Sequence, residues 1–112
     1  MAITSELLGK LGGADVEVIP VSATVKSKDP HIMYVGEILP GETGKVFVIG
    51  TVDARNSARY NLPDIGINST TSRFSGEGGV AESVTGNFQV YIQRRFTLGT
   101  DSFVGNVYIV RE

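Results

Sequence analysis

The segment 44–52, with the sequence GKVFVIGTV, carries apolar side chains on both of its alternating positions. One set consists of three valines and the other of an aromatic and an aliphatic residue: Val46, Val48 and Val52, then Phe47 and Ile49. Alternate residues of a β-strand point to opposite faces of the sheet, so this strand needs cover on both faces. We therefore predict a central strand here, with the rest of the chain arranged around it.

Further strands are predicted wherever apolar residues alternate between turn signals. The predicted segments are 15–26, 31–39, 63–67, 80–84, 88–98 and 103–110. Fourteen glycines in 112 residues supply many turns, and a chain of this length is typical of one domain. The pattern predicts an all-β fold: an antiparallel two-layer β-sandwich of the jelly-roll or immunoglobulin-like kind over residues 14–112, with a small β-barrel as the alternative.

Two hairpins are predicted from short turns between neighbouring strands. Residues 40–44 (PGETG) join strand 31–39 to the central strand, and residues 99–102 join strand 88–98 to the last strand. Two further expectations concern irregular stretches. The alternation shifts by one residue at Pro20, which indicates a bulge or an edge position. The segment 68–79, rich in serine, threonine and glycine, is predicted to be a long loop that is either functional or disordered, and its part 75–79 is predicted to be mobile.

Residues 1–13 hold the only helical pattern of the chain. Ile3, Leu7, Leu8 and Leu11 have the spacing of one helical face, and Gly12 begins a stop signal. Such a segment is too short to be a stable helix in water, since isolated helices need about 12–15 residues. It is therefore interpreted as a short helix packed on its own domain, as an arm that docks on a neighbouring subunit, or as a disordered end.

Reactive side chains are few. The chain has no cysteine and one histidine, His31, which lies beside a turn, and its twelve acidic residues are scattered. Nucleophilic catalysis needs a nucleophile, a base and an orienting group, and metal sites need clustered ligands. The glycine-rich stretch 75–79 lacks the lysine and the following helix of a phosphate loop. We expect no cofactor, no metal and no enzymatic activity.

The charge pattern bears on the partners. The formal net charge is −2, and the longest run of basic residues is Arg94-Arg95, so the footprint of a nucleic-acid-binding protein is missing. The first residues do not resemble a signal peptide, and no apolar run approaches the roughly 20 residues of a membrane helix. We expect protein partners rather than nucleic acid or membrane. The sequence leaves the location open, with the cytoplasm and a virion as the two alternatives.

Arginine and aromatic residues are favoured at protein interfaces. They gather in the two irregular segments of this chain, so we take them, with the N-terminal leucines, as interface candidates: Leu7, Leu8, Leu11, Arg55, Arg59, Tyr60, Arg73 and Phe74. Arg94 shares the parity of the apolar residues before it. It is interpreted either as a charge protecting a sheet edge or as half of a buried ion pair.

The function indicated is that of a non-enzymatic structural or assembly protein acting through protein–protein contacts, as a homo-oligomer or in a larger body such as a phage or virion. Part of this interpretation rests on analogy with compact, cysteine-free β domains of phage structural proteins. The alternative is a small β-sandwich that binds a ligand such as a carbohydrate, with Tyr60, Phe74 or Tyr91 as an aromatic platform.

Overall fold

The computed structural model describes residues 15–26, 28–55, 62–94 and 100–111. Within these ranges the chain forms strands and no helix, so the predicted N-terminal helix lies outside the described residues. The strands are β1 (Asp15–Val25), β2 (His31–Ile38), β3 (Gly44–Arg55), β4 (Asp64–Ile67), β5 (Thr70–Arg73), β6 (Gly76–Val84), β7 (Gly86–Gln93) and β8 (Thr100–Arg111).

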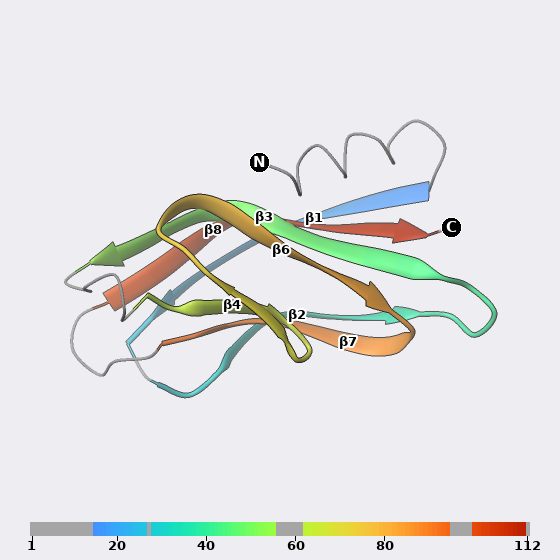
Figure 1. Ribbon diagram of the computed structural model, residues 1–112, viewed down its shortest axis with the longest axis horizontal. Helices are drawn as coiled ribbons and strands as arrows, with labels where there is room; N and C mark the ends of the chain where they lie inside the picture. Colours follow the sequence, from blue (N-terminus) through green and yellow to red (C-terminus); the bar gives the residue numbers. More distant parts are fainter. Residues whose placement is uncertain (1–14, 27, 56–61, 95–99, 112) are drawn as a thin grey trace.

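The strands form two antiparallel sheets of four strands each, and this confirms the all-β, two-layer prediction. Sheet A has the order β1-β8-β3-β6, and sheet B has the order β2-β7-β4-β5. The sheets lie above one another in a sandwich-like arrangement (Figure 1). Strand β3 pairs with β6 on one side and β8 on the other, as predicted for the segment that is apolar on both faces.

The chain passes from one sheet to the other at almost every connection. Only β4 and β5 are consecutive in sequence and paired in the same sheet. Both predicted hairpins are therefore wrong, because β2 pairs with β7 and not with β3, and β7 does not pair with β8. A short glycine-containing turn can join two paired strands of one sheet or two strands of different sheets. Here the strands on either side of each turn face each other across the core.

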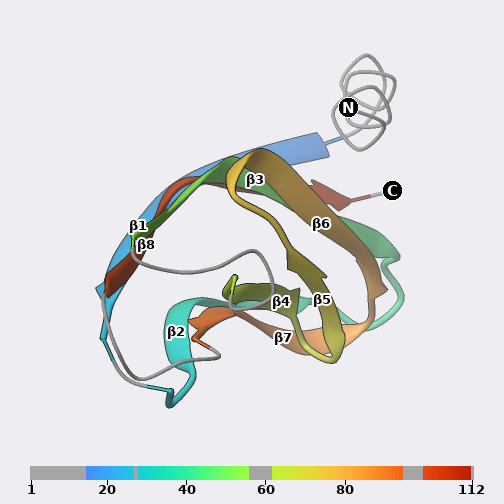
Figure 2. The same cartoon turned by 60° about the vertical axis from the view of Figure 1, so that its left-hand side comes forward.

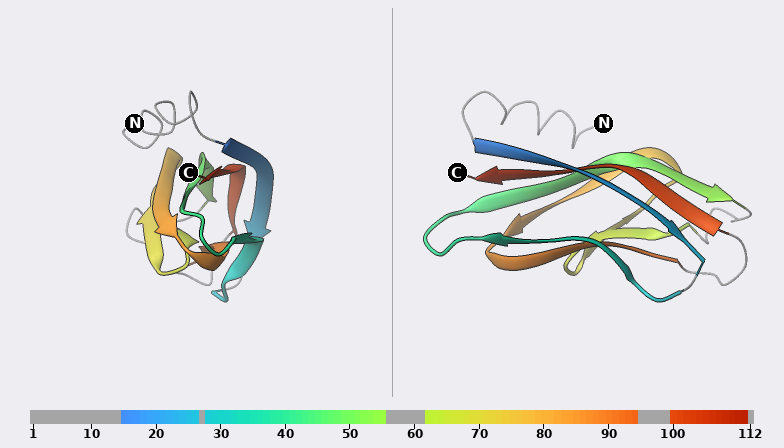
Figure 3. Two further views of the ribbon diagram at one scale, coloured as in Figure 1. Left: turned by 90° about the vertical axis from the view of Figure 1, so that its right-hand side faces the viewer. Right: turned by 180° about the vertical axis from the view of Figure 1, so that it is seen from behind.

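One core fills the space between the sheets. Its buried residues come from β1, β3, β6 and β8 of sheet A and from β2, β4 and β7 of sheet B. Strand β7 shows the predicted alternation, with Phe88, Val90 and Ile92 buried. Each such side chain contributes about 1.5–3 kcal/mol when it leaves water. Figure 3 (left), a view along the long axis of the molecule, shows the two sheets curving toward each other around this core.

The edge strands do not follow the sequence pattern in every detail. Strand β1 is an edge strand, as Pro20 indicated, but its pairing with β8 runs without a break from Asp15 to Val25. The predicted shift at Pro20 is therefore wrong: Val18 lies on the outer face, opposite in parity to the buried Val21. The register irregularity lies instead in β2, between Ile32 and Tyr34.

The glycine-rich segment after β4 is not a loop. Residues 70–73 form β5, and residues 76–79 begin β6, where they pair with β3. The ring of Phe74 lies against Gly78, and a Cβ atom at that position would come within 2.4 Å of the ring. The loop prediction was wrong because the low side-chain content of this stretch makes room for an aromatic ring on the strand.

A pair of glycines lies at the centre of sheet A. Gly50 of β3 and Gly105 of β8 are paired in register, and the ring of Phe103 lies over both. A Cβ atom on Gly105 would stand 2.3 Å from the carbonyl oxygen of Ile49 and 2.7 Å from the Cα atom of Gly50. These contacts are with backbone, which cannot rotate out of the way, so both positions require glycine.

We predict that Gly105→Ala destabilises the protein by about 2–3 kcal/mol, since overpacking a core typically costs about 1–3 kcal/mol. Thr51→Ala is the control, because Thr51 is exposed on the strand beside this contact and surface substitutions usually change stability by less than about 0.5 kcal/mol. Urea unfolding followed by circular dichroism measures both. Equal stability of G105A and wild type contradicts the close approach of the two strands.

Candidate interaction surface

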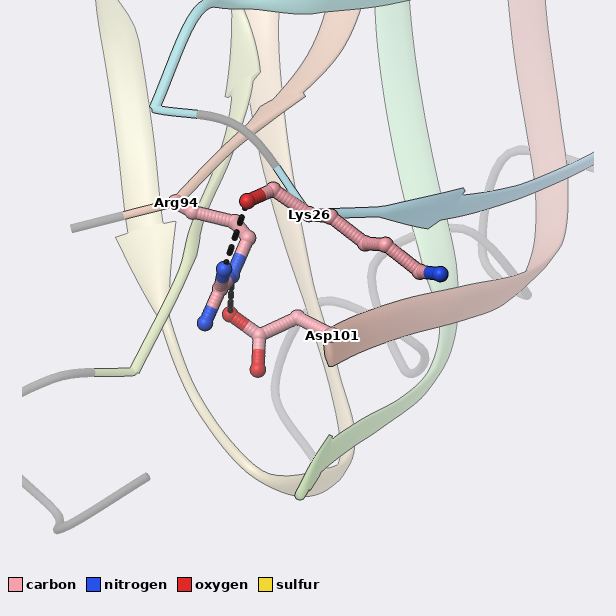
Figure 4. A network of polar contacts seen from close by, with 3 residues as sticks. All are labelled: Lys26, Arg94 and Asp101. Atoms are coloured by element: carbon pink, nitrogen blue, oxygen red, sulfur yellow. Dashed lines mark hydrogen bonds and ion pairs between the residues drawn. The ribbon is translucent and has the colours of Figure 1, made fainter. Parts of the chain in front are cut away.

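The most deeply buried charges of the described chain form one ion pair. Arg94 directly follows β7, and Asp101 lies near the start of β8 (Figure 4). Arg94 Nε donates a hydrogen bond to Asp101 Oδ2 at 2.9 Å, and the two side chains are 0% and 1% exposed. Arg94 Nη1 donates to the backbone carbonyl of Lys26 at 3.0 Å.

This pair ties the two sheets together at one end of the molecule. Arg94 continues sheet B, whereas Asp101 and the end of β1 before Lys26 belong to sheet A. Arg94 keeps the inward parity of Ile92, and β7 is flanked by β2 and β4. The buried-pair interpretation of Arg94 is therefore confirmed, and the sheet-edge interpretation is wrong. Arg95 lies outside the described residues.

We predict that Asp101→Asn destabilises the protein by about 3–5 kcal/mol, because removing one partner leaves the other charge buried without its counter-ion. The matched control is Arg73→Met, which removes an exposed pair with Asp64 (N–O distance 2.8 Å, Arg73 side chain 47% exposed). Exposed pairs contribute about 0–1 kcal/mol. Urea unfolding that shows similar losses for both variants contradicts the structural role of the buried pair.

The single histidine lies at the surface, as predicted from its place beside a turn. His31 is the first residue of β2 and is exposed. It borders a shallow hollow whose other lining residues come from β1 and β8: Ser22, Ala23, Thr24, Ser102, Phe103 and Val104. In the part of the chain that the structure describes, this lining offers hydroxyl groups and no carboxylate that could orient the imidazole as in a catalytic triad.

A second hollow lies beside the buried ion pair and is lined by Lys28, Asp64, Gln93 and Arg94. Its polar groups already contact other parts of the protein. Gln93 Nε2 donates a hydrogen bond to the backbone carbonyl of Lys28 at 3.2 Å, and Asp64 accepts one from Arg73. Among the described residues, no three His, Cys, Asp or Glu side chains gather where they could hold a metal ion.

Most of the predicted interface residues cannot be placed. Leu7, Leu8, Leu11, Arg59 and Tyr60 lie outside the described residues.

The other three candidates occupy different parts of the molecule. Arg55 ends β3, where it pairs with Thr100 in the strand register. Arg73 is exposed at the end of β5. Phe74 is partly buried and packs against the core between the sheets. The structure therefore does not bring Arg73 and Phe74 together on one exposed patch.

Tyr91, proposed as part of an aromatic platform, packs its ring against Gly66 of the neighbouring strand β4. Its ring covers Gly66, where a Cβ atom would be 2.4 Å from the ring. Its hydroxyl donates a hydrogen bond to the carbonyl of Asn68 at 2.7 Å. Partial burial and the nearby charge of Asp64 raise the pKa of Tyr91 above its usual value. Tyr91 therefore supports the turn between β4 and β5.

We predict that Tyr91→Phe lowers folding stability by about 1 kcal/mol through the lost hydrogen bond. We also predict that it changes how folding stability depends on pH in alkaline solution. The folded-state pKa of Tyr91 lies above the unfolded-state pKa of about 10. Above that pH the unfolded state releases its proton first, so wild-type stability falls as pH rises. Urea unfolding at neutral pH and above about pH 10 should show a smaller alkaline loss for Y91F. An equal loss contradicts this role of Tyr91.

Exposed apolar side chains identify a surface that the sequence reasoning missed. In the described chain, the large exposed ones are Val18 (54% exposed), Ile32 (41%), Val35 (61%), Leu39 (54%) and Val104 (65%). Four of these lie on the edge strands β1 and β2 or on β8 beside β1, and we call Val18, Ile32, Val35 and Val104 the edge set. Their parity, opposite to that of the core residues, was the signal available in the sequence.

The two sides of the molecule differ. Edge strands β1 and β2 lie on one side, and β5 and β6 lie on the other (Figures 2 and 3). The β5–β6 side is closed by Phe74 and by a hydrogen bond from the hydroxyl of Thr70 to the carboxylate of Glu82. The β1–β2 side presents strands of 11 and 8 residues, which carry Val18, Ile32 and Val35 of the edge set, with Val104 on the neighbouring β8.

None of the described residues belongs to a helix long and apolar enough to cross a membrane. Comparison of the chain with protein-family models, with curated proteins and with solved structures found no match. The function is therefore argued from the residues themselves.

Proposed function

We propose that the protein is a non-enzymatic assembly subunit that contacts copies of itself, or a larger body such as a phage or virion particle, through the β1–β2 side. The edge set is the observation that carries this proposal. Isolated exposed apolar residues are ordinary on protein surfaces, but four of the five large ones in the described chain lie on the edge strands β1 and β2 or on β8 beside β1. Exposed apolar surface of this kind marks protein contacts.

The strand arrangement supports the same proposal. Sheets with the orders β1-β8-β3-β6 and β2-β7-β4-β5, joined by connections that alternate between sheets, favour a jelly roll over an immunoglobulin-like topology. Jelly rolls are used by viral capsid proteins, and also by lectins and cupins, so the topology alone does not select a function.

The contact we propose uses side chains and not strand addition. An unpaired edge strand is a template for another strand. Both edges on this side are interrupted, however, because Pro20 has no N–H group to donate and β2 carries a register irregularity after Ile32. These features block continuous pairing with a neighbouring chain. The exposed valines remain available for packing against an apolar partner surface.

The ligand-binding alternative has less support. A carbohydrate platform needs an open aromatic face, whereas Phe74 packs against the core and Tyr91 lies on Gly66. Tyr60, the third residue of that hypothesis, lies outside the described residues. No observation favours this function over assembly.

We predict that the protein self-associates and that Val35→Glu combined with Val104→Glu weakens the association. Both side chains are more than half exposed, so the substitutions should leave folding stability within about 0.5 kcal/mol of wild type. Light scattering coupled to size-exclusion chromatography at tens of micromolar measures the mass. The expected result is an oligomer for wild type and a lower mass for the double variant.

The control is Thr71→Glu, which places the same charge on β5, at the opposite edge of sheet B from β2, where Thr71 is exposed. It should leave the oligomer unchanged. A wild-type protein that is only monomeric contradicts self-association, and a double variant that associates like wild type removes the edge set from the contact.

A further inference from the structure

Sheet A has a second apolar cluster on its outer face, separate from the core between the sheets. Phe47 and Val110 form its centre, and both are 0% exposed. The partly buried residues around them come from all four strands of the sheet: Val16, Ile49, Ala81 and Tyr108. These positions have the opposite parity to the core residues of the same strands, so sheet B does not cover them.

The outer face of sheet B is different. Its positions on β7 are Asn87, Gln89, Tyr91 and Gln93, and those on β4 and β5 include the ion pair of Asp64 with Arg73. This is the usual pattern of an antiparallel sheet with one face toward water. The two outer faces therefore differ: β7, β4 and β5 place polar side chains on that of sheet B, whereas part of that of sheet A is apolar and buried.

The buried part of the outer face is confined to one end of sheet A. The strand register places Val16, Val110 and Lys45 in one row across the sheet, followed by a row with Tyr108 and Phe47. Burial is deepest in the middle of these two rows, where Val110 and Phe47 have no exposed surface, whereas Val18 on β1 and Ser83 on β6 at their edges are exposed.

Farther along the same face the side chains become exposed. In the row of Ser22, Val104 and Thr51, all three are exposed. The buried rows are those beside Asp15, the first residue of β1, which pairs with Arg111. The buried end of this face is therefore the end at which β1 begins.

We propose that the outer face of sheet A at this end, centred on Phe47 and Val110, is the docking surface for the N-terminal segment of the same chain, with Ile3, Leu7, Leu8 and Leu11 against the sheet. The tether supports this occupant. Leu11 is four residues from Asp15, a reach of at most about 14 Å. The other face of the sheet is already filled by the core.

The dimensions also match. A helical segment from Ile3 to Leu11 rises about 12 Å, at about 1.5 Å per residue. The four strands of sheet A span three gaps of about 4.8 Å, or about 14 Å. One short amphipathic helix would therefore be long enough to cover the Phe47–Val110 cluster between the exposed Val18 on β1 and the exposed Ser83 on β6. Such a helix is too short to be stable alone, and the cluster supplies the packing that it lacks.

The same chain is favoured over a second copy as the source of this segment. A tether of four residues gives the segment an effective concentration in the millimolar range at its own sheet, above that of a neighbouring chain in dilute solution. Phe47 and Val110 are also fully buried in a single copy of the chain. The inference is independent of the proposed assembly, since it concerns the isolated subunit.

The absence of cysteine from the chain allows a direct test with a spin label at one introduced cysteine. Ser83 is exposed on β6 and pairs with Lys45, so S83C places a nitroxide on the proposed docking face. Q89C places it on the outer face of sheet B. In the full chain with labelled methyl groups, we expect the S83C label to remove most of the signal of Ile3, Leu7, Leu8 and Leu11, and the Q89C label to remove far less.

Three results overturn the inference. Equal broadening of the methyl signals by both labels shows that the segment has no fixed docking surface. No broadening by the S83C label shows that the segment docks elsewhere. The third test mixes spin-labelled chains with isotope-labelled, cysteine-free chains, all carrying Val35→Glu and Val104→Glu so that assembly does not bring labels close. Broadening in this mixture shows a segment docked on a second copy, and we expect none.

Matched variants in the segment provide an independent readout. Leu8→Ser should uncover the Phe47–Val110 cluster, raise the fluorescence of an apolar dye several-fold and abolish the broadening by the S83C label. Glu6→Ser changes a polar position of the same segment and should leave both signals unchanged. Equal responses of L8S and E6S contradict docking through the leucine face, whether or not the protein assembles.

Discussion

Sheet A is apolar on both faces, and this constraint organises the molecule. In β3 and β8 one set of alternate residues enters the core between the sheets and the other forms the outer cluster of Phe47 and Val110. Because an apolar face of a sheet is stable only when it is removed from water, a sheet with two apolar faces needs two separate covers. Sheet B provides the first, and we propose the N-terminal segment for the second.

The remaining surfaces follow from how the edges are closed. Arg94 and Asp101 join the sheets at one end through a buried ion pair, and Phe74 with the Thr70–Glu82 hydrogen bond closes the β5–β6 side. The β1–β2 side retains long edge strands with exposed valines. An assembly contact placed there leaves the two closed regions undisturbed and meets the outer face of sheet A only at Val18 and Val104, outside the buried cluster.

The comparison of prediction with structure is clearest in three elements. Strand β3 was predicted with its central position because two-sided apolarity demands it. The partners of β2 and β7 were predicted wrongly, because a short glycine turn is compatible both with a hairpin and with a step between sheets. The stretch 76–79 was predicted as a loop because composition alone does not show that Phe74 needs the space above Gly78.

The candidate surface shows the same limit. Parity distinguishes Val18 and Val104 from the core residues of their strands, but it does not tell which outward positions are covered. Phe47 and Val104 both face outward on sheet A, and only one of them is buried. The interface residues chosen by type, such as Phe74, were chosen without knowledge of which packed inward.

By itself, the sequence determined the number of faces that each strand must bury, because side-chain alternation is a local property of extended backbone. It thereby determined the all-β class, the central place of β3 and the inward direction of Arg94. Only the tertiary structure decided which strands pair, which charge meets Arg94 and which apolar residues stay exposed. These depend on contacts between segments far apart in the chain, such as Arg94 with Lys26 and Asp15 with Arg111, and no local pattern encodes the distance between them.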